Sequence, residues 1–312
     1  MDLRSGLFLS CLAIACALST PACVLAKTVD ALASTPRAVP SKIQNPKRDD
    51  ARLAVLWIGH ATTLIQIDDI FILTDPVFTK SVGEISARLV EPGLDVENLP
   101  HVNVALISHL HFDHLSLDSL DIIQHKIDRL FVPEGGLAYL PDYSFEPHEL
   151  GWWKSETLGD HPDSLKITAV PVQHNGMRYG IDSGWMKTSF TGYVIQYHGI
   201  TVYYGGDTAF NIKNFSDTAE LFPSIDLALL PIGPIEPRSF MKVSHEDPRE
   251  ALDAFALIHA KTMIPIHFDT FINSVDQTGD APKALDALVK ERHLEDKVFR
   301  LEIGQQKVVI PK

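Results

Sequence analysis

Apolar runs rich in β-branched residues alternate with polar clusters along most of the chain from residue 53 onward. Runs of about five to seven such residues, bounded by polar, Gly or Pro residues, are typical of β-strands. The pattern therefore places β-sheet at the centre of the fold. The predicted strands span residues 53–58, 63–67, 70–74, 102–108, 129–133, 165–172, 192–197, 200–205, 226–232, 262–266, 299–303 and 307–310.

Two connections between these runs are short enough to predict tight turns. Asp68 and Asp69 separate the second run from the third, as in a β-hairpin, and Gly199 lies between the runs that end at residue 197 and begin at residue 200. Each turn joins neighbouring strands, so we expect antiparallel pairs at both places.

Helical patterns occur at residues 116–127, 247–260 and 281–291. The second begins as a capping box does, with Asp247 as N-cap, Pro248 at the first helical position and Glu250 at the third. Strands outnumber helices, and we find no internal repeat. Because 45% of the 312 residues are apolar, the chain can bury a substantial core, and we expect α/β or α+β layers in a single domain.

The first 26 residues have the pattern of a secretory signal peptide. Arg4 precedes an apolar run from Leu7 to Leu18, and Val24-Leu25-Ala26 offers small residues where signal peptidase cleaves. The run is shorter than the about 20 apolar residues that span a bilayer. We therefore expect a protein exported to the periplasm or secreted; an uncleaved leader that anchors it in the membrane is the alternative.

Residues 27–50 are polar and rich in Pro, which predicts a linker, and residues 51–312 then form the folded domain. Cys11, Cys16 and Cys23 are the three cysteines of the chain, so a mature chain that starts after Ala26 has neither disulfides nor thiolate ligands. The formal charge of −13, from 27 basic and 40 acidic residues, argues against nucleic acid as a partner.

The strongest chemical signal is the segment from His109 to His114, which follows the predicted strand at residues 102–108. It presents His109, His111, Asp113 and His114 within six residues. On a helix these side chains would point in different directions, whereas a tight loop can direct them to one point. Imidazole and carboxylate ligands suit Zn²⁺, or less often Fe or Mn. The alternative is a solvated loop that happens to be rich in His.

Three later residues, His174, Asp207 and His267, each follow a predicted strand. Taken singly, they would more often be capping, turn or core residues. Because strand ends far apart in sequence can meet at one edge of a sheet, the three together with the cluster favour one metal site.

This pattern resembles the metallo-β-lactamase superfamily: H-x-H-x-D-H at residues 109–114, a distant His, Gly206-Asp207-Thr208 and a final His. Within it, the chain resembles the N-acylphosphatidylethanolamine-hydrolysing phospholipase D group. Residues 57–62 (WIGHAT), 73–76 (LTDP) and 231–245 are the basis of that likeness. The resemblance covers about residues 53–275 and implies an αββα four-layer sandwich with metals at one edge.

The resemblance also implies a ligand set for two Zn²⁺ ions. One ion would be bound by His109, His111 and His174 and the other by Asp113, His114 and His267, with Asp207 bridging them. Such a pair can lower the pKa of a shared water and direct the resulting hydroxide at phosphorus or carbonyl carbon. Hydrolysis is therefore the expected chemistry.

Four residues have expected roles around the metals. Asp113 could also hold the proton of the nucleophile, and His245, just before a helix, could contact substrate or protonate a leaving group. The resemblance implies that Asp75 orients ligand histidines and that His60 lies on the substrate side. The alternatives are a turn Asp at residue 75, a buried hydrogen-bonding residue at 60 and a loop residue at 245.

The expected partner is a small-molecule or phospholipid substrate, and peripheral membrane contact and a homodimer are further hypotheses. The resemblance suggests a lipid phosphodiester cleaved on its head-group side. Residues 189–193 (SFTGY) depart from the Trp-Gly-Ser-Trp expected in close lipid-cleaving relatives, and the pocket wall is expected there. The alternatives are a sugar-lactone hydrolase and an exported zinc-binding protein without turnover.

Overall fold

The computed structural model describes residues 35–83, 86–160, 164–179, 182 and 188–312. The predicted signal peptide and residues 27–34 lie outside the described residues, so export and the fate of the leader stay predictions. Among the described segments, no helix combines the length and the apolar character needed to cross a membrane.

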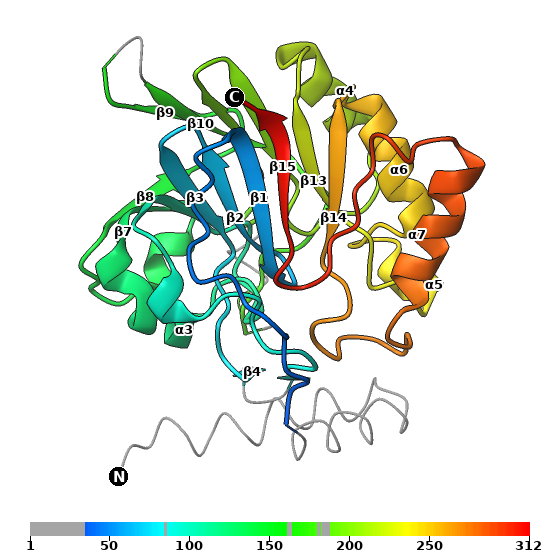
Figure 1. The fold of residues 1–312 in the computed structure, drawn as a ribbon, viewed down its shortest axis with the longest axis horizontal. Coiled ribbons are helices and arrows are strands. Elements are labelled where there is room, and N and C mark those ends of the chain that lie inside the picture. Colours follow the sequence, from blue (N-terminus) through cyan, green and yellow to red (C-terminus); the bar gives the residue numbers. More distant parts are fainter. Residues whose placement is uncertain (1–34, 84–85, 161–163, 180–181, 183–187) are drawn as a thin grey trace.

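Two β-sheets lie face to face and form the inner layers of the molecule (Figure 1). Their strand orders are β15-β1-β2-β3-β6-β7-β8 and β14-β13-β12-β11-β10-β9. The strands of the first sheet are β1 (Ala51–Gly59), β2 (Thr62–Ile67), β3 (Ile70–Thr74), β6 (Val102–Leu106), β7 (Ile127–Pro133), β8 (Glu146–Leu150) and β15 (Gln306–Pro311). Those of the second sheet are β9 (Ser155–Leu158), β10 (Leu165–Val170), β11 (Gly192–Tyr197), β12 (Ile200–Tyr204), β13 (Leu227–Pro231) and β14 (Thr262–Ile266).

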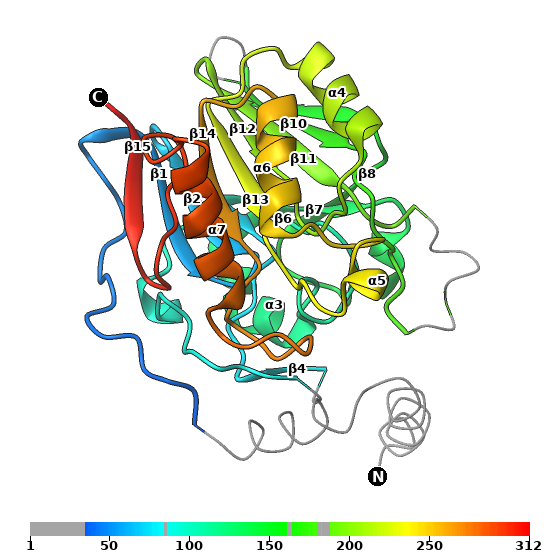
Figure 2. The ribbon, with the colours of Figure 1, turned by 90° about the vertical axis from the view of Figure 1, so that its right-hand side faces the viewer.

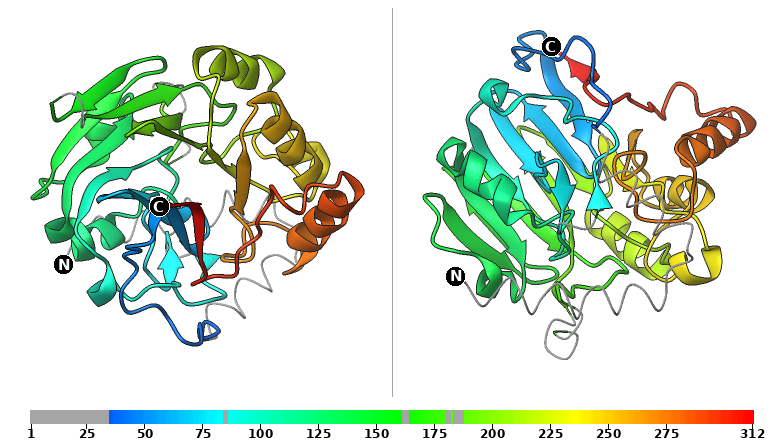
Figure 3. Two further views of the ribbon diagram at one scale, coloured as in Figure 1. Left: turned by 45° about the horizontal axis from the view of Figure 1, so that its top comes forward. Right: turned by 90° about the horizontal axis from the view of Figure 1, so that it is seen from below.

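Helices cover the outer faces of both sheets, and the predicted single-domain αββα sandwich is thereby confirmed. On the second sheet, α6 and α7 lie side by side over β13 and β14 (Figure 2), and they stay on the outside of the molecule in the views of Figure 3. The helices of the described residues are α3 (Leu117–Ile123), α4 (Ile212–Leu221), α5 (Arg238–Met241), α6 (Pro248–Leu257) and α7 (Asp280–Glu291), with single 3₁₀ turns η1 (Val96–Asn98), η2 (Gln124–Lys126) and η3 (Gly136–Tyr139).

The alternation of side chains along the strands explains why the sheets pack on both faces. In β1, Val55 and Trp57 join the core between the sheets, whereas Leu56 and Ile58 join a separate core beneath α3, to which Leu120 contributes. This period of two follows from the pleat, which points successive side chains to opposite faces. All four β1 residues are at most 1% exposed, so the strand is buried on both sides.

Most predicted elements are confirmed, with shifted ends. The hairpin turn at Asp68-Asp69 and the turn at Gly199 join antiparallel pairs, and β6, α3 and β7 form the expected βαβ unit. The capping box is present: the Asp247 side chain accepts hydrogen bonds from the backbone N–H groups of Arg249 and Glu250. The helix that follows ends at Leu257 instead of Ala260.

One predicted strand is wrong, and several elements were not predicted, among them α5 and the short strands β4 (Ser81–Val82) and β5 (Ser86–Ala87). Residues 299–303 make no strand; an isolated bridge between Val298 and Met263 precedes them, and the chain turns at Gly304 after them. The polar strands β8 and β9 and the helix α4 were missed. β8 and β9 lie at sheet edges and are partly exposed, so they need no alternation of apolar residues.

Residues 35–50, which belong to the predicted linker, lie along the domain. The backbone N–H of Arg37 donates to the carbonyl of Leu89 at 2.9 Å, and the Lys42 ammonium lies 2.8 Å from an oxygen of Asp95. A third contact joins the backbone N–H of Arg48 to the side-chain oxygen of Gln66 at 2.7 Å.

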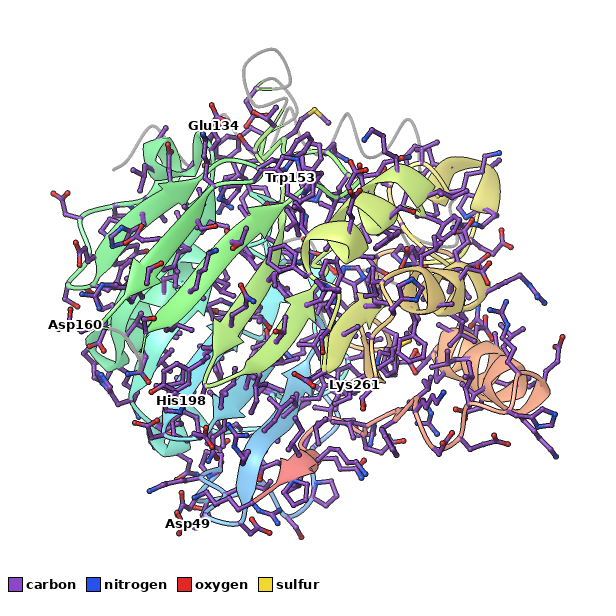
Figure 4. All side chains as sticks on the ribbon, turned by 90° about the horizontal axis from the view of Figure 1, so that it is seen from above. Asp49, Glu134, Trp153, Asp160, His198 and Lys261 are labelled. Carbon is purple, nitrogen blue, oxygen red and sulfur yellow. The ribbon has the colours of Figure 1, made fainter. Side chains whose placement is uncertain are left out.

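The parallel strands of both sheets end at the same edge of the sandwich. β3 and β6 end there in the first sheet, as do β12, β13 and β14 in the second. The Tyr204 hydroxyl at the end of β12 donates to Asp75 at the end of β3, 2.5 Å away, and so joins the two sheets at this edge. Lys261 and His198 mark the opposite edge, which faces the viewer in Figure 4.

We predict that Gly206→Ala, at the edge where the parallel strands end, lowers the free energy of unfolding more than Gly199→Ala does in its turn. Both glycines have positive φ, 57° and 77°, so each Ala costs about 1 kcal/mol or more of backbone strain. A Cβ at residue 206 would also lie 2.3 Å from Cβ of Ser108, whereas no atom of the described residues lies within 4 Å of a Cβ at residue 199. Overpacking adds about 1–3 kcal/mol.

Urea unfolding of the two variants measures this difference. The free energy of unfolding should fall further for Gly206→Ala than for Gly199→Ala, which serves as the matched control. Equal losses would show that Ser108 moves aside freely and that this edge is not closely packed.

Candidate metal centre

The predicted ligands come from loops that leave the two sheets at this edge. The loop after β6 turns sharply, because the backbone N–H groups of His114 and Leu115 both donate to the carbonyl of His111, at 3.1 and 2.9 Å. His174 follows β10, Asp207 follows β12 and His267 follows β14. The structure thus brings together all seven residues that were predicted as ligands.

His109, His111 and His174 form the first group. Nε2 of His109 lies 2.8 Å from Nδ1 of His111, and that Nδ1 lies 3.3 Å from Nε2 of His174. Their ring centroids are 4.4 to 5.0 Å apart, with each pair of rings nearly perpendicular. Three nitrogens therefore converge on one point, from residues separated by up to 65 positions.

Outer hydrogen bonds fix the proton positions on two of these rings. Nδ1 of His174 donates to the carbonyl of Ser244 at 2.9 Å, and Nε2 of His111 donates to Oδ1 of Asn175 at 3.0 Å. A neutral imidazole has one N–H, so the two nitrogens that face each other both present lone pairs. Lone pairs at 3.3 Å repel unless a cation lies between them, and the donor set therefore fits a divalent metal such as Zn²⁺.

Asp113, His114 and His267 form the second group, and His60 lies beside them. One donor atom from each of these four residues lies within 4.8 Å of the others. Nδ1 of His267 donates to the carbonyl of Gly233 at 2.9 Å, which leaves its Nε2 as an acceptor. Nε2 of His114 and Nε2 of His267 are buried and make no hydrogen bond to any described residue, so both face the centre as ligand atoms.

The Asp207 carboxylate lies between the two groups. Its Oδ1 is 3.0 Å from Nε2 of His267, and its Oδ2 is 3.4 Å from Nε2 of His114 and 3.9 Å from Nε2 of His174. The side chain is 2% exposed. A carboxylate in this place can contact one cation with each oxygen.

Burial and neighbouring charges set the protonation of the site. Burial lowers the pKa of His109 and of His174 well below the usual value, so both rings are neutral and able to bind metal. Burial alone would raise the pKa of Asp207, but His267 and His114 outweigh it and hold that pKa well below its usual range. Conversely, burial would lower the pKa of His114, yet Asp207, Asp75 and Asp113 raise it well above normal. The same negative field favours a cation.

Asp75 is the hydrogen-bonding centre beneath the second group. One oxygen accepts from the backbone N–H of Ser108 at 2.7 Å, and the other lies 2.5 Å from Nδ1 of His114 and accepts from Tyr204. Asp75 is fully buried. Because Nδ1 of His114 donates to Asp75, its Nε2 faces Asp207, and a metal bound there would replace the proton that the raised pKa of His114 otherwise holds on Nε2. The alternative of an isolated turn aspartate does not describe these contacts.

His60 and His245 lie on two sides of the centre. Nε2 of His60 is 3.0 Å from Oδ2 of Asp113, and burial lowers the pKa of His60 to about 3. Nδ1 of His245 is 3.6 Å from Oδ2 of Asp207, and its side chain is 16% exposed, more than the other rings near Asp207. The Arg238 guanidinium donates to the backbone carbonyl of His245 at 3.0 Å and so holds this loop.

Several residues of the site were not found from the sequence. Asn175 and the carbonyls of Ser244 and Gly233 orient ligand rings, but a carbonyl has no sequence signature. The pocket wall is expected at residues 189–193. In this segment the backbone N–H of Thr191 donates to the carbonyl of Ser108 at 2.8 Å, and the Ser189, Phe190 and Thr191 side chains are at most 8% exposed, so it supports the start of the metal-binding loop.

We predict that Asp75→Asn weakens metal binding about 10- to 100-fold, as loss of an outer hydrogen-bond partner usually does. An amide N–H that faces Nδ1 of His114 would move the ring proton to Nε2, the ligand atom. Competition with a chromogenic chelator measures the affinity. The matched control is Asp128→Asn, because Asp128 makes a similar contact with His101, at 2.9 Å, on the exposed surface. Equal affinities for both variants would refute the orienting role.

Comparisons with known proteins agree with this architecture. A family model described as "Beta-lactamase superfamily domain" matches residues 71–268. The chain is 32% identical over 236 residues to N-acyl-phosphatidylethanolamine-hydrolyzing phospholipase D 1 of Caenorhabditis elegans, which covers 71% of this chain and 65% of that protein. It is 25% identical over 276 residues to the mitochondrial enzyme of that name in Saccharomyces cerevisiae, covering 86% of this chain and 58% of the relative.

The chain thus spans less than two thirds of the length of these two relatives. Among solved structures, Igni18, a metallo hydrolase from Ignicoccus hospitalis, has a TM-score of 0.59 at 23% identity and covers 82% of this chain and 97% of its own. An isothiocyanate hydrolase from Delia radicum gut bacteria has a TM-score of 0.64 at 17% identity, covering 83% and 100%. These two likenesses support the fold. The chain belongs to the β-lactamase superfamily, with the metallo-β-lactamase fold of its metal-dependent hydrolases.

Proposed function

We propose that this metal-dependent hydrolase is a phosphodiesterase that cleaves an N-acylphosphatidylethanolamine-like phospholipid on its head-group side, with two Zn²⁺ ions as cofactors. The observation that supports it is the pair of converging donor groups with Asp207 between them. His109, His111 and His174 would hold one ion and Asp113, His114 and His267 the other. The phospholipase D relatives suggest the substrate class.

The charge balance favours an anionic substrate. Two divalent cations outweigh the carboxylates of Asp113 and Asp207, so the loaded centre is cationic and attracts a phosphodiester. When bound, the metals would supply Lewis acidity and a water of lowered pKa.

The residues of the chain would then position substrate and protons. Asp113 contacts His60 through Oδ2, which fixes the orientation of its carboxylate towards the centre. Burial lowers the pKa of His245 to about 4, so its ring is neutral at pH 7. A neutral imidazole at the exposed side of the centre can donate one N–H to a phosphoryl oxygen. Of the two roles expected for His245, we therefore propose substrate contact.

Peripheral membrane contact is a second part of the proposal. Phe240 in α5 and Val243 after it are 69% and 56% exposed, and Lys242 between them is also exposed. They lie next in sequence to Ser244 and His245, which border the metal centre. Apolar side chains of this kind, beside a cation, can enter the boundary between head groups and acyl chains. A lipid could then reach the centre without leaving the bilayer.

A Phe240→Glu variant tests this contact. We expect it to bind vesicles of phosphatidylethanolamine and phosphatidylglycerol less tightly than the wild type in a sedimentation assay, because a carboxylate is expelled from the interface. Hydrolysis of soluble bis(p-nitrophenyl) phosphate should not change. Ile122→Glu, at a 46% exposed position on α3, is the control. Unchanged vesicle binding by the Phe240 variant would refute this surface.

The substrate itself is tested by product analysis. We expect N-acylphosphatidylethanolamine in mixed micelles to yield phosphatidic acid and N-acylethanolamine, detected by mass spectrometry and abolished by EDTA. Turnover of sugar lactones without phosphodiesters would favour the lactonase alternative. Metal binding with no turnover of either would favour a non-catalytic zinc protein. Both results would contradict the phosphodiesterase proposal.

Replacing the shared carboxylate should abolish turnover. We predict that Asp207→Ala lowers kcat/KM for bis(p-nitrophenyl) phosphate by about a thousandfold or more, about 4 kcal/mol of transition-state stabilisation, and loosens both metals. Asp217→Ala, which removes an exposed carboxylate paired with Lys213 in α4, is the matched control. An active Asp207→Ala variant that retains both metals would contradict the ligand assignment.

A further inference from the structure

The buried guanidinium of Arg178 lies against the metal-binding loop. Its Nη1 donates to the carbonyls of Leu110 and Leu115, both at 2.8 Å. Leu110 lies between His109 and His111, and Leu115 follows His114. One side chain therefore holds the loop at two points, on either side of the Asp113 ligand.

Packing fixes the guanidinium in a third direction. Its central carbon lies 4.2 Å from the ring centre of Phe112, which stands between His111 and Asp113, and 5.8 Å from that of Tyr179. Arg178 is 7% exposed. The planar group therefore stacks on the loop as well as donating to it, a combination that a Lys ammonium cannot reproduce.

The backbone of Arg178 is itself held by a buried carboxylate. Oδ2 of Asp182 accepts from the Arg178 N–H at 3.0 Å and from the Tyr139 hydroxyl at 2.7 Å. Asp182 is 1% exposed, and Tyr139 belongs to η3, which follows β7. The Arg178 side chain is thereby tied, through Asp182 and Tyr139, to the first sheet independently of the metal ligands.

No ion pair explains the burial of this cation. Within the described part of the chain, the Arg178 guanidinium donates to backbone carbonyls and forms no salt bridge, and its Nε is buried without a hydrogen bond. Burial lowers the pKa of Arg178. Burying a guanidinium costs free energy. The contacts that it makes here fix the conformation of residues 110–115. The segment that contains Arg178, residues 174–178, also supplies the ligand His174 and, through Asn175, orients His111.

We propose that Arg178 is a positioning residue that sets the geometry of the metal-binding loop, an inference that rests on the proposed two-metal site. Without it, the carbonyls of Leu110 and Leu115 lose their shared donor, and the loop can relax away from the converging arrangement of His109, His111 and His174. The metal ligands would remain in the sequence but would no longer be pre-arranged.

The test compares Arg178→Met and Arg178→Lys with Arg129→Met, which removes an arginine paired with Glu146 at the surface and serves as the control. Zn²⁺ affinity is measured by chelator competition, and the coordination geometry by the visible absorption spectrum of the Co²⁺-loaded protein. We expect the Met variant to bind Zn²⁺ about 10- to 100-fold more weakly and to show an altered Co²⁺ spectrum. The control should match the wild type.

Rescue separates positioning from a general packing role. A third variant, Arg178→Ala, leaves a cavity in place of the side chain, so added guanidinium ion at millimolar concentration should restore part of its affinity and spectrum, whereas the Lys variant should remain impaired. If the Met variant does not fold, the Lys variant decides by the same two measurements. Wild-type affinity and spectrum in a folded variant would overturn the inference, whereas a wild type that binds no metal would instead overturn the proposed function.

Discussion

The nitrogens of His111 and His174 present lone pairs to each other at 3.3 Å, and this contact is the constraint on which the account depends. Hydrogen bonds to Asn175 and to the carbonyl of Ser244 place the ring protons on the far sides. Water can satisfy two acceptors, but here His109 and Asp207 approach the same space. A cation removes the repulsion among all of them at once, which is why the arrangement points to metal.

Buried polar contacts hold this arrangement, although parts of its backbone are strained. His60, Asp75 and His267 all have positive φ, at 55°, 33° and 63°, in a region that non-glycine residues seldom adopt. Each such residue costs about 1–3 kcal/mol, so the surrounding fold must stabilise it. The contacts of Asp75 with Ser108, His114 and Tyr204 show how: one carboxylate joins both sheets to a ligand ring.

The sequence predicts those parts of the molecule in which the residue types of a short segment determine its local structure or chemistry. Residues 53–58 and 70–74 are continuous apolar runs because their strands are buried on both faces, and the His cluster is recognised by the type of its ligands. β8 and β9 could not be predicted, because edge strands tolerate polar residues. Residues 299–303 have a strand pattern, yet the chain turns at Gly304 before a ladder can form.

Side chains that bind backbone groups could not be predicted for a different reason. Arg178 and Asp182 contact partners that are defined only by the folded chain, such as the carbonyls of Leu110 and Leu115, and carbonyls are the same in every residue. Asp75 was predicted to orient ligand histidines, and its contact with His114 fits that role. The hydrogen bond that Asp75 accepts from the Tyr204 hydroxyl, which joins the two sheets, could be found only from the structure.

Anomalous diffraction from crystals of the full chain, grown with Zn²⁺ and recorded on both sides of the zinc absorption edge, tests the central claim most directly. Two peaks are expected, one among His109, His111 and His174 and the other among Asp113, His114 and His267, with Asp207 in contact with both. A single peak, or a peak with no contact to His174 or His267, would contradict the two-metal centre.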